Sequence, residues 1–147
     1  MISDLGLSSR NEVLEPIVKS GQFYQTFISP KNNLKGINLF LSTYYIKITT
    51  PYKLVLYDET CNKIILESEI EVAKIDDNKY TEVFFNEIND SKDKMYCFTI
   101  EPMVENIETP VTLNYSKKGS YNMGGLILDG ENQKDEDIVF QLIYPIK

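Results

Sequence analysis

Residues 21–41 read GQFYQTFISPKNNLKGINLFL, and this stretch decides the fold class. A polar and aromatic segment, a Pro-Lys-Asn-Asn turn and a second alternating segment follow one another here without a gap. In the second segment Ile37, Leu39 and Leu41 alternate with mixed positions, and this period of two is typical of a strand with one buried face. The stretch therefore predicts two strands and a short turn, as at the start of an antiparallel β-sandwich.

The period of two continues along the chain. Leu54 and Leu56 repeat it, and residues 63–72 alternate apolar side chains with glutamates, which predicts one core face and one solvent face. Turn-forming residues bound further expected strands at 80–85, 95–101, 111–115, 125–128 and 137–144. About eight or nine such strands predict an all-β fold, and we expect an antiparallel β-sandwich with jelly-roll-like connections.

The length of 147 residues suits one domain with its own core. We expect residues 21–147 to form the sandwich and residues 1–20 to be an N-terminal extension or a short helix. Ser8 or Ser9 would cap that helix and Pro16 would end it.

Composition excludes several classes of function. The net charge of -7 argues against binding to nucleic acid or to an anionic membrane. No signal peptide and no apolar stretch of about 20 residues is evident, so direct membrane insertion is not expected, and both a cytoplasmic and a cell-surface location stay open. Histidine is absent. A Ser-His-Asp hydrolase or a zinc enzyme is therefore excluded, and we expect a protein that is not an enzyme.

The two cysteines and the acidic runs suggest no special chemistry. The spacing and setting of Cys61 and Cys97 mark neither a disulfide framework nor a redox pair, so both are interpreted as free.

Asp76 and Asp77 are adjacent, which favours a turn over a pair of catalytic carboxylates. The acidic run DGENQKDED at 129–137 is interpreted as a solvated turn, so no cofactor is expected. A structural calcium ion is the alternative, with the candidate ligands Asp129, Glu131, Asp135 and Asp137.

Aromatic rings and amide or carboxylate groups occur together at expected strand ends and turns. Sugars need this combination, because their C–H faces stack on rings and their hydroxyls bond planar polar groups. The candidate ligand-binding residues are Asn32, Asn33, Tyr44, Tyr45, Asp77, Asn78, Tyr115, Tyr121 and Asn122. The alternative is that the tyrosines only cover a sheet face and the asparagines only form turns.

The stretch GQFYQTFISPKNNLKGINLFLSTY resembles the opening of a bacterial β-sandwich module found beside glycosyltransferases and other enzymes of cell-surface polysaccharide synthesis. Asn32-Asn33-Leu34 with Gly36-Ile37, then Thr43-Tyr44, carry the resemblance, and Asp77-Asn78, Gly124-Gly125-Leu126 and Asp129-Gly130 follow in the same order. It spans roughly residues 21–144. The family's Thr-Tyr is typically followed by Gly-Arg, whereas here Tyr45 and Ile46 follow.

The resemblance implies a non-catalytic, carbohydrate-binding accessory module. Such a module would recognise a cell-surface glycan and localise an attached or partner enzyme of polysaccharide synthesis. A structural module that mediates homo-oligomerisation or domain docking is the alternative.

Overall fold

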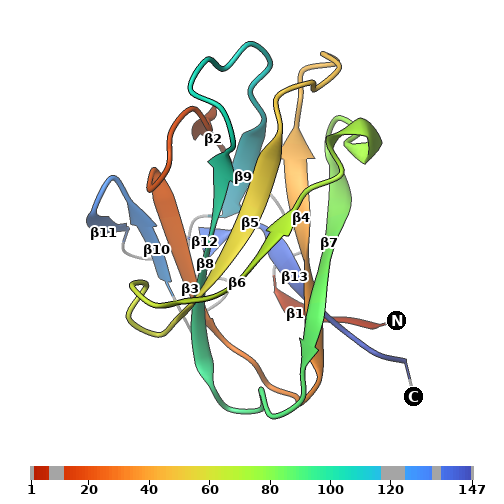
Figure 1. The fold of residues 1–147 in the computed structure, drawn as a ribbon, viewed down its shortest axis with the longest axis vertical. Coiled ribbons are helices and arrows are strands. Elements are labelled where there is room, and N and C mark those ends of the chain that lie inside the picture. Colours follow the sequence, from red (N-terminus) through yellow and green to blue (C-terminus); the bar gives the residue numbers. More distant parts are fainter. Residues whose placement is uncertain (1, 7–11, 117–124, 134–136, 147) are drawn as a thin grey trace.

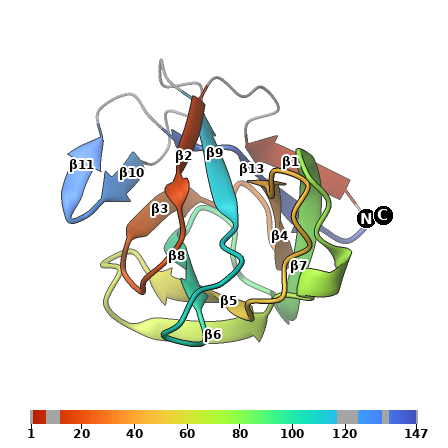
Figure 2. The ribbon, with the colours of Figure 1, turned by 90° about the horizontal axis from the view of Figure 1, so that it is seen from above.

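Two antiparallel sheets pack face to face in the computed structural model, which describes residues 2–6, 12–116, 125–133 and 137–146 (Figures 1 and 2). The strands are β1 (Ile2–Gly6), β2 (Glu12–Pro16), β3 (Phe23–Ile28), β4 (Leu34–Ser42), β5 (Tyr52–Asp58), β6 (Ile64–Glu69), β7 (Lys79–Ile88), β8 (Met95–Pro102), β9 (Thr112–Ser116), β10 (Gly125–Leu128), β11 (Glu131–Gln133), β12 (Asp137–Ile138) and β13 (Phe140–Tyr144). Within the described residues the helical structure is limited to the short 3-10 turn η1 (Val72–Lys74). The expected all-β antiparallel sandwich is confirmed.

Each sheet has its own strand order. The first sheet runs β1-β13-β4-β9-β12, with β2 paired to β9 and β7 paired to β4. The second sheet runs β11-β10-β3-β8-β5-β6. Most consecutive strands alternate between the sheets, so the chain crosses repeatedly at the two ends of the sandwich. The sequence predicted fewer strands because it missed β1, β2 and β11 and took β12 and β13 as one.

The N-terminal residues belong to the first sheet and form no helix in their described part. β1 pairs with β13 and β2 pairs with β9, both antiparallel. The expectation of a short helix ending at Pro16 is therefore wrong for the described residues, and its expected caps, Ser8 and Ser9, lie outside them. Local capping signals predicted it, but pairing with strands more than 90 residues away in the chain decides the conformation, and no local pattern reports that pairing.

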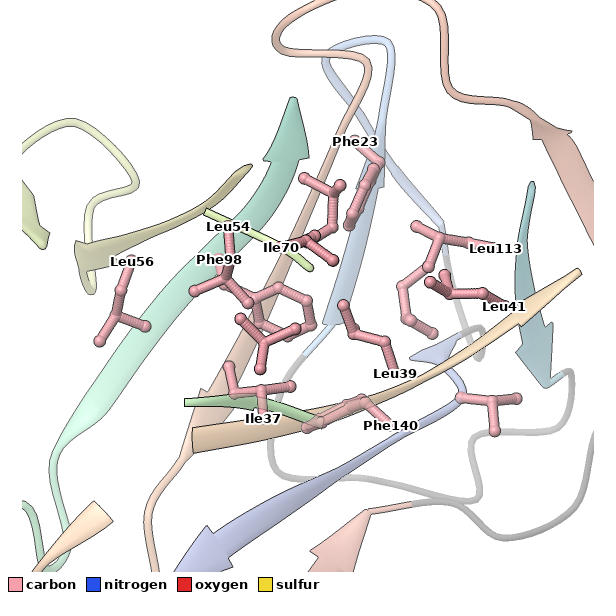
Figure 3. Close-up of a cluster of buried hydrophobic side chains, with 14 of the residues drawn as sticks. Phe23, Ile37, Leu39, Leu41, Leu54, Leu56, Ile70, Phe98, Leu113 and Phe140 are labelled. Carbon is pink, nitrogen blue, oxygen red and sulfur yellow. The ribbon is translucent and has the colours of Figure 1, made fainter. Parts of the chain in front are cut away.

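The core lies between the sheets and contains the side chains that the alternation predicted. Ile37, Leu39 and Leu41 of β4 face Leu54 and Leu56 of β5 across the sandwich, and all five are buried (Figure 3). Phe27 of β3 packs against three further rings, those of Tyr96, Phe98 and Phe140. Because β4 is anchored in this core, both of its ends have fixed positions. A loop adjoins each end.

Strand β6 departs from the expected pattern. On the face expected to be buried, Ile64 is exposed and Leu66 is only partly buried, whereas Ile65, on the expected solvent face, is exposed as predicted. The strand is the edge of the second sheet, so it lacks a covering layer over its first residues. Ile70, just beyond β6, is the residue of this segment that enters the core.

Cys61 and Cys97 form a disulfide, so their interpretation as free thiols is wrong. Cys61 lies in the turn after β5, and Cys97 lies in β8, directly opposite Tyr57 of β5. The turn folds back over the outer face of the second sheet and brings the two Cα atoms to 5.3 Å. Pairing of β5 with β8 creates this proximity, and a sequence separation of 36 does not reveal it.

None of the helical segments described in the structure has the length and apolar character needed to cross a membrane.

Candidate functional site

A tight turn directly after β4 displays two tyrosines to solvent. We call residues Thr43–Ile46 the tyrosine turn. The backbone N–H of Ile46 donates to the carbonyl oxygen of Thr43 at 3.1 Å, which closes the turn. Tyr44 and Tyr45 are its central residues and are 62% and 91% exposed. It lies at the upper end of β4 in Figure 1, where loops of both sheets gather.

The backbone of the tyrosine turn is strained. Tyr44 has φ 54° and Tyr45 has φ 63°, so two consecutive bulky residues occupy the left-handed region. A turn with positive φ at both central positions is of type I′, which favours Asn and Gly there. A non-glycine residue in this region costs on the order of 1–3 kcal/mol, and such residues cluster at functional sites. The turn therefore keeps two tyrosines where chain geometry prefers smaller residues.

Asp77 holds the tyrosine turn in place. Its Oδ1 atom accepts the backbone N–H groups of Thr43 at 2.6 Å and Tyr44 at 2.9 Å. The Nδ2 group of Asn78 donates to the second carboxylate oxygen at 3.3 Å. Both Asp77 and Asn78 come from the loop before β7. The predicted residues Tyr44, Tyr45, Asp77 and Asn78 are thus in one place, but the last two bind the protein's own chain and do not present free groups to a ligand.

A buried polar chain connects this loop to the interior of the first sheet. The Oγ of Ser42 donates to Oδ1 of Asn78 at 2.7 Å, and Nδ2 of Asn114 donates to Oγ of Ser42 at 3.0 Å. Asn114 is fully buried in β9 and also donates to the carbonyl of Phe40 at 3.2 Å. This junction lies where β4 changes partner from β13 to β9. The tyrosine turn is therefore attached to a rigid part of the sandwich.

Neighbouring loops at the same end are tied together by hydrogen bonds. The hydroxyl of Thr109 accepts the backbone N–H groups of Thr49 and Thr50 at 2.8 and 3.0 Å. The N–H of Met103 donates to the carbonyl of Pro51 at 2.8 Å. Exposed apolar side chains on these loops are Ile46, Met103 and Val104, with Val18 on the loop before β3. The end of the sandwich is thus an ordered surface with several apolar side chains.

Sequence reasoning missed an aromatic pair below the tyrosine turn. Phe40 of β4 and Tyr80 of β7 are directly opposite each other, and their ring centroids are 5.2 Å apart. Both rings are half-buried, and burial raises the pKa of the Tyr80 hydroxyl. Ile46 was also missed. The only signal for it was the apolar run Tyr44-Tyr45-Ile46 at a strand end.

The other ligand-binding candidates lie elsewhere. Asn32 and Asn33 are in the turn before β4, at the end of that strand opposite to the tyrosine turn. Tyr115 of β9 is partly buried against the core. Tyr121 and Asn122 lie outside the described residues. The structure therefore gathers four of the nine candidates.

The calcium candidates do not converge in the described part of the chain. Asp129 forms an ion pair with Lys19 at 3.3 Å in the turn between β10 and β11, and Glu131 begins β11. Asp137 is buried instead, and its Oδ1 accepts the side-chain amide of Gln25 at 3.1 Å. Asp135 lies outside the described residues. Among the residues described, no three acidic or cysteine side chains gather as they would around a metal ion.

No family model matches the chain, and no curated protein is significantly similar to it in sequence.

Proposed function

We propose that this protein is a non-catalytic carbohydrate-binding module whose tyrosine turn contacts the glycan. In this role it holds an attached or partner enzyme of polysaccharide synthesis near its polymer. The observation that carries the proposal is the pair of exposed rings, Tyr44 and Tyr45, on a strained but firmly anchored turn. A tyrosine ring stacks on the C–H face of a sugar, and its hydroxyl bonds a sugar hydroxyl.

Anchoring of the turn supports recognition by preorganisation. Because Asp77 and Asn78 fix the backbone before a ligand arrives, little conformational entropy is lost on binding. The same contacts favour binding over catalysis, since both oxygens of the Asp77 carboxylate already accept hydrogen bonds. A shallow site with two stacking rings suits a modest affinity for one end or one face of a glycan.

The experiment replaces the tyrosines by the residues that the turn geometry prefers. The Tyr44→Asn, Tyr45→Gly double variant relieves the strain, so its free energy of unfolding should rise by about 1–2 kcal/mol. On a glycan array, and by calorimetry with the glycans found, this variant should lose binding. Met103→Ala, a change at another exposed side chain of the same end, should keep it.

Two results would refute the proposal. One is that the unmodified protein binds no glycan on the array. The other is that the double variant binds as tightly as the unmodified protein, which would make the turn a purely structural element.

A role in assembly is the second candidate, and the apolar side chains beside the turn favour it. Ile46, Met103 and Val104 are exposed at one end of the sandwich, where a partner surface would cover them. A dimer formed through this end should dissociate in Ile46→Asp, as measured by light scattering after size exclusion. A monomer at all concentrations would remove this candidate.

A further inference from the structure

Each sheet has an open edge on the same side of the sandwich. β6 is the last strand of the second sheet, and β7 pairs in the first sheet with β4, so in the described part of the chain each has one side without a strand partner. The two strands lie beside each other (Figures 1 and 2). The Oγ of Ser68 in β6 donates to the carbonyl oxygen of Phe84 in β7 at 2.7 Å. An open edge is available for pairing with a strand of another chain.

The pairing of β6 with β5 shows which backbone groups of β6 point outward. The N–H of Ile70 donates to the carbonyl oxygen of Tyr52 at 2.9 Å, so these two residues form a hydrogen-bonded pair. In an antiparallel ladder such pairs alternate with non-hydrogen-bonded pairs, and the register places Glu67 and Glu69 in the second kind. Their N–H and C=O groups therefore point away from β5. They offer donors and acceptors to an added strand.

A groove of about 450 Å³ lies between β6 and β7. We call it the edge groove, and it is lined by Leu66, Glu67, Ser68, Phe84, Phe85 and Asn86. Phe84 is 41% exposed, and Leu66 and Phe85 are partly buried. Alternate side chains of a strand point to one face, so every second side chain of an added strand would meet these apolar groups. The groove therefore favours an occupant that is apolar at alternate positions.

A second hollow, of about 460 Å³, follows the edge groove along the same two strands. We call it the acidic hollow; its apolar lining includes Ile65, Ile88 and Met95, and its acidic lining is Asp58, Glu59 and Asp93. Ile65 directly precedes Leu66 of the edge groove in β6, and Ile88 ends β7. A segment extended along β6 would pass from one hollow to the other within a few residues, because a strand advances about 3.3 Å per residue.

The acidic hollow combines apolar side chains with unpaired negative charge. None of its three carboxylates, Asp58, Glu59 and Asp93, has an ion-pair partner among the described residues. Lys94 also lines the hollow, but its ammonium group is paired with Asp90 at 2.7 Å. A lysine or arginine side chain matches this lining, since its aliphatic stem packs on apolar groups and its cationic end reaches the carboxylates.

We propose that the open edge of β6 pairs with an extended segment of a partner protein in which lysine or arginine alternates with apolar residues. The backbone of Glu67 and Glu69 bonds this segment, the edge groove takes its apolar side chains, and the acidic hollow takes a cationic one. A second copy of this chain does not match, because two antiparallel β6 strands would place these glutamates opposite each other, and like charges there are destabilising. The site shares no residue with the tyrosine turn, so it does not depend on the function proposed above.

The test is an NMR titration of the full chain with two synthetic peptides at constant ionic strength. One peptide alternates lysine with valine, and the other alternates glutamate with valine. With the lysine peptide, the amide signals of residues 65–69 and 93 should shift and saturate. Hydrogen exchange at the amides of Glu67 and Glu69 should slow about ten-fold at saturation, as expected when an open N–H gains a backbone partner. The glutamate peptide should not bind.

Two substitutions separate the backbone contribution from the charge. Glu69→Pro removes an outward N–H that pairing with β5 does not use, and it should weaken binding of the lysine peptide about ten-fold. Its matched control Glu69→Gln keeps the N–H and should weaken binding only about two-fold. Asp93→Asn should weaken it about three-fold, and asparagine tolerates the φ of 65° at this position. Glu105→Gln, in the loop after β8, removes an equal charge and should have no effect.

Three results would overturn the proposal: no saturable shifts with the lysine peptide, equal binding of the glutamate peptide, or saturation without slower exchange at Glu67 and Glu69. A dimer of the unmodified protein that dissociates in Glu69→Pro, as measured by light scattering, would also overturn it, since the occupant would then be a second copy. If Glu69→Pro does not fold, Asp93→Asn decides, because unchanged binding of the lysine peptide to that variant contradicts the role of the acidic hollow.

Discussion

Reduction of the disulfide between Cys61 and Cys97 is expected to lower the free energy of unfolding by about 4 kcal/mol. The bond closes a loop with a sequence separation of 36. In the chain-entropy model, a loop of this length removes about 13 cal/mol/K from the unfolded chain, which corresponds to about 4 kcal/mol at 25 °C. Cys97 is fully buried in β8, so we expect the native packing to change little on reduction.

Urea unfolding with and without a reducing agent measures this effect. The chain has no tryptophan, so far-UV circular dichroism or tyrosine fluorescence is the suitable signal. With a denaturant slope of about 2 kcal/mol/M, the midpoint should fall by about 2 M urea on reduction. The Cys61→Ala, Cys97→Ala variant is the control, since a reducing agent should not change its midpoint.

Two observations would contradict this reasoning. If the purified, unreduced protein shows two reactive thiols after denaturation, the bond does not form. If the bond forms but its reduction shifts stability by less than about 1 kcal/mol, the turn after β5 is ordered enough in the unfolded chain to make the crosslink redundant.

The remaining predictions concern single side chains. Gly36→Ala should destabilise the fold by about 1–3 kcal/mol in urea unfolding, because the added Cβ would lie 2.7 Å from the carbonyl oxygen of Val83. An unchanged midpoint would mean that β7 can move away. Tyr52→Phe should cost about 1–3 kcal/mol, since the buried carbonyl of Ile17 loses the hydroxyl that donates to it at 2.7 Å. Calorimetric melting measures this, and a neutral result would require a replacement donor. Desolvation, together with nearby negative charge, raises the pKa of Tyr57 to about 12. Its contribution to stability is therefore full below the unfolded pKa of about 10 and is lost as the pH rises through about 12. In a spectrophotometric titration at 295 nm, Tyr57→Phe should remove one late step, and an unchanged profile would contradict the assignment.

The fold was largely predictable from sequence, because its signals are local. Alternation of side chains at Ile37, Leu39 and Leu41 reports which face of a strand is buried, whatever the strand pairs with. The same reasoning failed for Ile64, which was expected in the core and is exposed. The alternation of residues 63–72 is equally regular, but β6 is an edge strand, and a local pattern does not reveal whether a second layer covers it.

The candidate site was predictable in its residue types and not in its arrangement. Tyr44 and Tyr45 were selected as aromatic residues at a strand end, and they are exposed there. Asp77 was selected as a turn residue or a ligand group, and it instead fixes the backbone of Thr43 across a separation of 34 residues. Asn32 and Asn33 were grouped with them by composition, although the length of β4 separates them from the tyrosine turn.

Sequence alone determined the sandwich class, most of the core and the absence of histidine chemistry, since these depend on residue type and local period. Only the tertiary structure decided the disulfide, the strand character of the described N-terminal residues, and the strained display of Tyr44 and Tyr45. Each of these depends on contacts between segments distant in the chain. Strand pairing and loop packing, which set those contacts, are properties of the whole chain.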